Sequence, residues 1–433
     1  MTSGKTYQNQ VTMIEEIWKR PFARPLGVWI AGILLYTCGW ARGVWIGALA
    51  LVLVPVLCLA GGEDARRRQY QDRWLWGATF VLLTLSLSVA VAYYRDIRSE
   101  RIPERASIVR LYAREAQLAL LEKVERLRLS DEEKGVVAAL TLGYTRWMDW
   151  ETRQRFSLTG VAHILSVSGF HVAVVCGFLS FLCAFFPRGR LWQGIRYLLL
   201  MTGLWFYVFM TGLAPPSIRS GLMLSFYLTG KLLRRTTDGY NTLAAAAFCM
   251  LVYDPAYLFD IGFQLSYLAV YFILFLAPRL NRLIEVRNPL LATPWGWVTV
   301  SIAAQAGTTL LCFYYFKQFP LVFLLTNLPV SLFATALLPV SVLWFCVPET
   351  LWGYEALRVS MEGLTRAMVW IVDVFSEFPY AAFIGGLDGV ETVMGYVALV
   401  CGLCYLKGRN PKSLLAALLF LLILSLKILL RIF

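Results

Sequence analysis

Residues 320–347 read PLVFLLTNLPVSLFATALLPVSVLWFCV, a stretch of 28 residues without a single Asp, Glu, Lys or Arg. A helix needs about 20 predominantly apolar residues to cross the hydrocarbon core of a bilayer. Thirteen candidate spans of this kind, several of them short or broken, lie near 27–38, 43–61, 74–94, 158–186, 197–213, 216–230, 240–257, 261–278, 295–316, 320–347, 363–376, 390–406 and 413–430. The pattern predicts an all-α fold, a polytopic transmembrane helical bundle with about 11–13 membrane helices.

The composition excludes an ordinary soluble protein. Of the 433 residues, 58% are hydrophobic and 15% are charged, and the mean hydropathy is +0.62. A soluble chain of this length needs more polar surface. Because the first 25 residues are polar and basic and no small-residue cleavage site follows the first apolar stretch, we expect no cleavable signal peptide. The prediction is a multi-pass protein of the bacterial inner membrane, surrounded by the lipid bilayer.

We expect no cofactor, no metal site and no catalytic residue. Cys401 and Cys404 form a CxxC, but it lies inside an apolar span and the sequence has no second half-site, so a structural role is favoured. Gly4-Lys5-Thr6 lacks the upstream glycine and the preceding strand that a phosphate-binding loop requires. Transport is therefore not expected to be powered by a nucleotide site on this chain.

The net charge of +13 is explained first by membrane topology, because cytoplasmic loops retain Lys and Arg. When the N-terminus is placed inside and sides alternate, the seven inner segments hold 22 Lys and Arg and the five short outer connections hold two. This asymmetry predicts a cytoplasmic N-terminus. The inner segments are 1–25, 62–73, 187–196, 231–239, 279–294, 348–366 and 407–412.

The distribution of charge divides the chain into three parts. Residues 1–94 are predicted to form N-terminal membrane helices, and residues 158–433 a channel-like membrane domain. Residues 95–157 hold 13 basic and 11 acidic side chains and are predicted to be an extracytoplasmic helical segment, since long loops cross largely regardless of charge. Within it, Leu120, Val124 and Leu127 recur at helical spacing, which indicates an amphipathic helix lying on the membrane or on the bundle.

Polar residues inside apolar spans are costly and therefore mark candidate sites. The first cluster is GVAHILSVSGFH at 160–171, which contains both histidines of the protein. Taken as one helix, it places Ser168 and His171 on one face, with His163 about 80° around the axis. Ser166 lies between the histidines, and Gly169 is a point where the helix can open or another backbone can approach.

The second cluster is GLAPPSIRSG at 212–221. Its paired prolines predict the end of one helix and the start of the next. Arg219 is then expected in the first turn of that helix, beside free backbone N–H groups and the hydroxyls of Ser217 and Ser220. Such an arrangement favours an anion such as phosphate, with Pro216 shaping the turn.

The third cluster is YDPAYLFDIGFQLSY at 253–267. Asp254 and Asp260 bracket a turn, and Asp260 is expected to cap the helix that follows. Gly262 and Ser266 are four residues apart and indicate a close helix-packing face, with Gln264 between them.

A fourth, looser set of polar groups, including Asn327, is spread over the spans at 295–316 and 320–347. For every cluster, interhelical hydrogen bonding is the alternative to a function. That alternative is strongest for the third and fourth clusters and weakest for the first two, because a membrane Arg and two buried His cost most.

These stretches resemble the competence domain of ComEC-type DNA-uptake proteins, in the order and spacing of that family. The resemblance is firm over about 135–345 and rests on GVAHILSVSGFH (160–171), PSIRSGLM (216–223), DPAYLFDIGFQLS (254–266) and YYFKQFPLVFLLTNLP (314–329). It implies an inner-membrane channel that carries one DNA strand into the cytoplasm during natural transformation. The residues that match the family's motifs, and so the expected substrate path, include His163, Ser168, Gly169, His171, Pro216, Ser217, Arg219, Asp254, Asp260, Gly262, Gln264 and Ser266.

Full-length relatives of that family usually carry an OB-like and a metallo-β-lactamase-like domain. This chain departs from that pattern. Residues 95–157 show helical rather than strand patterning, and both histidines lie in apolar spans. We therefore expect a chain without its own nuclease. The partners that the resemblance implies are single-stranded DNA, a DNA receptor, a separate nuclease, a cytoplasmic ATPase and a second copy of the chain.

Two other functions remain open on the sequence. A transporter of a smaller anion, such as a lipid-linked or glycan precursor, needs the same cationic site. An intramembrane serine hydrolase is suggested by Ser168 and His171, since such pairs activate nucleophiles, although proteolytic dyads usually draw the two residues from different elements. For Arg219 there are likewise two readings: a phosphate contact in a conduit, or a structural charge neutralised by Asp254 or Asp260.

Overall fold

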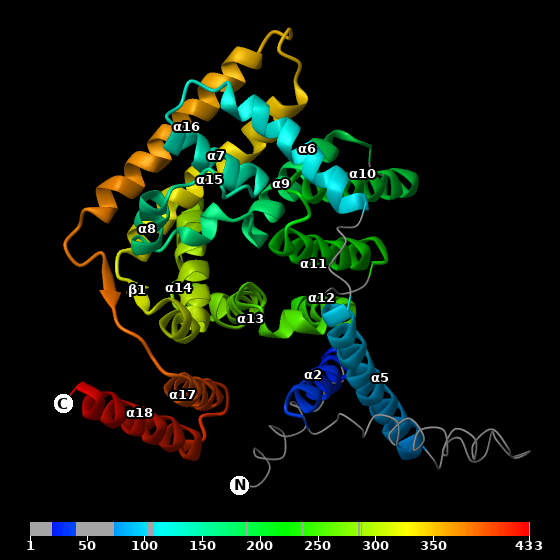
Figure 1. Cartoon of the computed structure of the whole chain (residues 1–433), viewed down its shortest axis with the longest axis vertical. Coiled ribbons are helices and arrows are strands. Elements are labelled where there is room, and N and C mark those ends of the chain that lie inside the picture. Colours follow the sequence, from blue (N-terminus) through cyan, green and yellow to red (C-terminus); the bar gives the residue numbers. More distant parts are fainter. Residues whose placement is uncertain are drawn as a thin grey trace, which may run out of the picture.

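The computed structural model describes residues 20–39, 73–101, 108–187, 189–234, 238–284, 286 and 288–432. Helices dominate this part of the chain, and two three-residue strands accompany them (Figure 1). The α-helices are α2 (Ala23–Thr37), α5 (Arg73–Arg101), α6 (Ile108–Glu125), α7 (Asp131–Leu142), α8 (Trp150–Leu158), α9 (Gly169–Leu182), α10 (Arg190–Met210), α11 (Pro215–Leu232), α12 (Gly239–Tyr253), α13 (Ile261–Asn281), α14 (Pro289–Phe316), α15 (Phe323–Cys346), α16 (Tyr354–Ser376), α17 (Gly389–Gly408) and α18 (Pro411–Ile432). The 3₁₀-helices are η1 (Ala162–Leu165), η2 (Cys183–Phe185) and η3 (Pro255–Phe259), and the strands are β1 (Gln318–Pro320) and β2 (Ala382–Ile384).

The predicted all-α membrane architecture is confirmed. Among the described residues, five helices are long and apolar enough to cross a bilayer: Gly77–Arg98, Ile261–Asn281, Leu291–Phe316, Phe323–Cys346 and Gly389–Leu406. Three shorter apolar helices accompany them, at Ala23–Thr37, Gly169–Phe185 and Gly239–Tyr253. The protein is therefore a multi-pass membrane protein. The number of 11–13 spans stays a prediction, and the candidate span 43–61 lies outside the described residues.

One predicted span is wrong as drawn. Residues 158–186 do not form one helix, because α8 ends at Leu158, η1 follows, and α9 starts only at Gly169. Gly160 has a φ of +82°, a left-handed conformation that ends α8 and that residues with a side chain rarely adopt. The extended backbone of Ser166 and Ser168 then separates η1 from α9. Hydropathy continues through this break, which is why the apolar count missed it.

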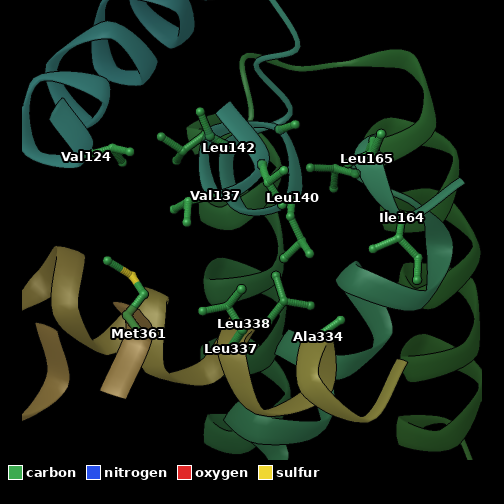
Figure 2. Packing of buried hydrophobic residues seen from close by; sticks show 14 of the residues in the cluster. Val124, Val137, Leu140, Leu142, Ile164, Leu165, Ala334, Leu337, Leu338 and Met361 are labelled. Atoms are coloured by element: carbon green, nitrogen blue, oxygen red, sulfur yellow. The ribbon is translucent and has the colours of Figure 1, made fainter. Parts of the chain in front are cut away.

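A single large hydrophobic cluster joins the charged segment to the membrane helices. Figure 2 shows Val137 and Leu140 of α7 facing Leu337 and Leu338 of α15, with Met361 of α16 and Val124 of α6 nearby and Leu142 on the other side of α7. All of these side chains are fully buried. The core of α7 thus lies within the bundle, and the amphipathic helix expected near 120–127 is α6, whose buried face packs on the bundle. The boundary drawn at 157 stays a prediction.

The two strands join connections that the charge count places on the same side of the membrane. β1 follows α14 and pairs antiparallel with β2, which follows α16, with Phe319 opposite Phe383. Both connections are outer segments in the alternating count, so the pairing agrees with it. Gln318 also donates a hydrogen bond to Ser157, at the end of the segment predicted to lie outside.

Another contact corrects the charge count. Arg126 Nη1 lies 2.9 Å from Glu349 Oε1, and Arg366 Nη2 donates to the backbone carbonyl of Arg128 at 2.6 Å. The count places 95–157 outside and 348–366 inside, and contacts of this length do not allow that combination.

The two arginines of segment 348–366 have local partners that explain their positions. Arg358 pairs with Glu362 at 2.9 Å, and both side chains are about nine-tenths buried. Arg366 contacts the Arg128 carbonyl. Arg358 therefore lies on the packed face of α16, whereas Arg366 is exposed, and the helix begins at Tyr354, nine residues before the predicted span. The partners of the two arginines explain their positions without reference to a side of the membrane.

Candidate functional site

The first turn of α9 is closed by His171. Its Nδ1 accepts a hydrogen bond from the backbone N–H of Ser168 at 2.9 Å, and the Ser168 hydroxyl lies 2.8 Å from the same nitrogen. The third residue of a helix reaches back to its N-cap in the same way in a capping box. Because Nδ1 accepts, the proton of a neutral imidazole is on Nε2. The side chain is fully buried, and its Nε2 has no hydrogen-bond partner in the described part of the chain.

The other residues of this motif lie outside α9. His163 is in η1, exposed, and its Nδ1 is 3.2 Å from the Gly160 carbonyl oxygen. Ser166 is also exposed and lies in the extended link before α9. The two histidines therefore do not share one helix, and the 80° relation expected between them is wrong because the helix is interrupted.

The start of α11 buries a cation. Pro215 is the first residue of the helix, as the paired prolines predicted. Arg219 is the fifth helical residue rather than a first-turn residue, so it lies just past the free N–H groups. It is 3% exposed, and Ser217 is fully buried. Among the described residues, neither Arg219 Nε nor Ser217 Oγ has a hydrogen-bond partner.

Asp260 caps α13 and pairs with this arginine. Its Oδ1 accepts the backbone N–H of Phe263 at 2.7 Å, as predicted for a cap, and lies 3.5 Å from Arg219 Nη1. The side chain of Asp260 is 48% exposed. Asp254 instead caps η3, where it accepts from Ala256 at 3.0 Å. Of the two acids offered by the sequence, Asp260 is thus the one that contacts Arg219.

The structure brings the three motifs together through two glycines. A Cβ added at Gly169 would lie 3.2 Å from Ser220 Oγ, so the first turn of α9 touches the second turn of α11. A Cβ at Gly262 would lie 3.2 Å from Arg219 Nη2, so the first turn of α13 touches the same part of α11. Figure 1 shows α9, α11 and α13 as neighbouring parts of the bundle. A residue without a side chain is needed at both positions because another helix approaches closely there.

The electrostatics of this junction favour an anion. The first turns of two helices present partial positive charge to a third helix that carries a buried guanidinium. One carboxylate, half exposed and already holding a backbone N–H, faces this charge. A buried cation and unpartnered donors require further neutralisation. A phosphate group supplies both the charge and the acceptor oxygens.

The remaining predicted residues have structural partners. Gln264 donates to the Leu258 carbonyl and accepts from Tyr315 Oη, both at 3.0 Å. Ser266 bonds back to the Gly262 carbonyl at 2.7 Å, within its own helix. These contacts connect η3, α13 and α14 around the junction.

Two further residues of the predicted path also have packing roles. Asn327 donates to Ser301 at 2.7 Å and thereby joins α15 to α14, and no described contact brings it to Arg219. Ser220 Oγ donates to the Pro216 carbonyl at 2.9 Å. Asn327 thus fits the interhelical role that was the alternative for the fourth cluster.

Sequence reasoning missed the aromatic surroundings of Arg219. Tyr257 of η3 and Tyr267 of α13 lie in the neighbourhood of the guanidinium, and the ring of Tyr267 lies against that of Phe263 with centroids 4.2 Å apart. The signal was present in the third motif, which is rich in tyrosine and phenylalanine. No group of three or more His, Cys, Asp and Glu able to hold a metal ion occurs in the described ranges.

Comparisons with known proteins place these motifs in a family. A family profile described as "Competence protein" matches residues 140–410. The chain is 31% identical over 213 residues to "ComE operon protein 3" of Bacillus subtilis, covering 49% of this chain and 26% of that protein. It is 28% identical over 257 residues to "Competence protein ComA" of Neisseria gonorrhoeae, covering 57% and 35%. An uncharacterized protein of Aquifex aeolicus is 28% identical over 314 residues, covering 72% and 67%.

The match to the first two relatives is partial, since the chain spans 26% and 35% of their lengths. No solved structure matches this chain. The region matched by the family profile includes η1, the starts of α9, α11 and α13, and the whole junction around Arg219.

Proposed function

This chain belongs to the competence protein family, and from that premise we propose that it conducts single-stranded DNA into the cytoplasm along a path past Arg219. The observation that carries the proposal is the buried guanidinium of Arg219, which lies beside the first turns of α9 and α13 and is paired with one half-exposed carboxylate, that of Asp260. A phosphodiester strand brings one negative charge per nucleotide and suits a sparse set of N–H and cationic points. Two further donors of the same motifs, His171 Nε2 and Ser217 Oγ, have no partner among the described residues and suit phosphate oxygens as well.

In this proposal the chain conducts and another protein cuts. A separate nuclease, a DNA receptor and a cytoplasmic ATPase supply what a channel cannot, and a second copy of the chain is compatible with the exposed apolar helices. These partners are inferred from the family alone.

Deletion of the gene tests the function. Cells given end-labelled duplex DNA should lose labelled cytoplasmic single strand and transformants, whereas nucleotides released from the degraded strand should stay near the parental level because cleavage belongs to a separate protein. A plasmid copy should restore uptake. Unchanged uptake in the deletion strain, with an envelope defect instead, would favour a transporter of a smaller anion. If the deletion strain also stopped releasing nucleotides, and a missing separate nuclease did not account for this loss, cleavage would be assigned to this chain.

The same cationic junction serves a carrier of lipid-linked phosphate, which is why that function is the second candidate. The serine hydrolase has less support from the geometry. His171 Nδ1 is occupied by the N–H and hydroxyl of Ser168 within a single helix turn, so the pair completes a helix cap. A serine-directed phosphonate should leave Ser168 unlabelled.

We further propose that the protein lies in the bacterial inner membrane, with its N-terminus in the cytoplasm and with α6 of the 95–157 segment on the outer side. A single cysteine at Glu115, an exposed position of α6, should react in intact cells with a membrane-impermeant maleimide in a cysteine-free background. The matched control is Leu191→Cys, at the start of α10 in the segment predicted to be cytoplasmic, which should react only after permeabilisation. The reverse pattern would invert the orientation.

A further inference from the structure

The carboxylate of Asp260 performs two tasks with one oxygen. Oδ1 accepts the Phe263 N–H at 2.7 Å and faces Arg219 Nη1 at 3.5 Å. The first contact is short and the second is long for an ion pair, so the carboxylate is held by the helix end more firmly than by the arginine. The position in front of Arg219 is therefore occupied by an anion that the arginine does not bind tightly.

The two partners differ in exposure. Arg219 is 3% exposed, whereas the Asp260 side chain is 48% exposed. A half-exposed carboxylate is solvated by water when it turns away, at low cost. The buried guanidinium has no such alternative and needs an anion beside it at all times.

We propose that Asp260 competes with the substrate phosphate for Arg219. Asp260 pairs with Arg219 in the interval between two phosphates of the strand, and each arriving phosphate displaces it. The inference rests on the proposed function and deepens it. A transport site must bind well enough to admit its substrate and weakly enough to release it. Exchange between a fixed carboxylate and a moving phosphate lowers the net gain of each binding event without leaving Arg219 uncompensated.

The geometry around the pair supports exchange. A Cβ at Gly262 would lie 3.2 Å from Arg219 Nη2 and 3.3 Å from Asp260 Oδ1, so the absence of a side chain there keeps both groups accessible to each other. Arg219 Nε stays unpartnered among the described residues, which leaves one donor for a second oxygen of a phosphate. The first turn of α13 adjoins the same place, since a Cβ at Gly262 would contact both groups.

Asp260→Asn separates the two tasks. Asparagine caps helices as well as aspartate does, so α13 should remain capped, while the competing charge is lost. Full-length protein in nanodiscs should bind a fluorescein-labelled 20-nucleotide single strand roughly 3- to 10-fold more tightly at fixed salt, by anisotropy. DNA uptake in cells carrying this variant should be slower by a similar factor, because release becomes limiting.

Asp149→Asn is the matched control. Asp149 caps α8 by accepting the Thr152 N–H at 3.0 Å, and no described contact joins it to Arg219. Its neutral variant loses the same formal charge and should bind and transport like the parent protein. Inorganic phosphate added as a competitor should displace the strand from both the parent and Asp260→Asn, if a phosphate group is what the site recognises.

The outcomes separate this inference from the proposed function. Parental or weaker binding by Asp260→Asn, together with binding lost in Arg219→Ala, would overturn the competitor role and leave the conduit intact. Parental binding by Arg219→Ala would remove the site from the DNA path altogether. Should Asp260→Asn fail to accumulate, Asp260→Ser supplies another neutral cap and the same comparison. Equal tightening in Asp149→Asn would reduce the effect to net charge and overturn the inference.

Discussion

Arg219→Ala should lower DNA uptake roughly 10- to 100-fold while the protein accumulates near its normal level. The loss corresponds to one charge-assisted hydrogen bond to phosphate, worth about 1.5–3 kcal/mol. The fold should tolerate the change, because Asp260 keeps its contact with Phe263 and its side chain is already 48% exposed. Removing the arginine also removes a buried, partly unsatisfied guanidinium. Transformation frequency and immunoblots of membrane fractions measure the two effects.

Arg219→Lys and Arg279→Ala complete the design. Lysine keeps the charge and loses the planar fork, so uptake should fall between the parent and Arg219→Ala. Arg279 is an exposed arginine at the far end of α13 whose guanidinium, among the described residues, contacts Phe275 of its own helix, and its alanine variant should behave as the parent does. A structural role for Arg219 predicts instead that the alanine variant is degraded. Abundant Arg219→Ala protein with full uptake would contradict both roles.

Local signals were sufficient to predict most elements of the junction. The Pro215-Pro216 pair marked the start of α11, and Asp260 was identified as a cap from its position before an apolar run. These features depend on neighbouring residues only. The capping box formed by Ser130 and Glu133, just before Val136 and Val137, is also a local signal for the start of α7. The high charge of the surrounding segment obscures this signal.

Contacts between distant parts of the chain could not be predicted from the sequence. Asp254 and Asp260 were equal candidates to pair with Arg219, and only the close approach of α13 to α11 decides for Asp260. The charge count failed for a similar reason when it put 348–366 and the Arg126–Arg128 turn on opposite sides of the membrane. The two arginines of 348–366 satisfy partners on α16 and in that turn, and a count of charges cannot tell an arginine with such a partner from one retained by topology.

Gly160→Ala should destabilise the protein by about 2–4 kcal/mol and abolish uptake with it. The residue has a φ of +82°, and its added Cβ would lie 2.7 Å from the Phe323 Cβ and 2.8 Å from the Pro320 Cγ. Neither neighbour is the free end of a flexible chain: Phe323 begins α15, and Pro320 is paired in β1. The turn after α8 would have to move, and η1 and the start of α9 would move with it.

Gly177→Ala is the control for this prediction, since it makes the same chemical change inside α9 at a site with nothing within 4 Å. Alanine favours a helix interior by about 1 kcal/mol over glycine, so this variant should melt at or above the parental temperature. Thermal melting of detergent-solubilised protein, followed by size-exclusion chromatography, compares the three proteins. Gly160 holds the GVAHILSVSGFH motif against the start of α15, and a parental melting temperature with parental uptake in Gly160→Ala would show that this contact does not fix the position of His163 and Ser168 relative to Arg219.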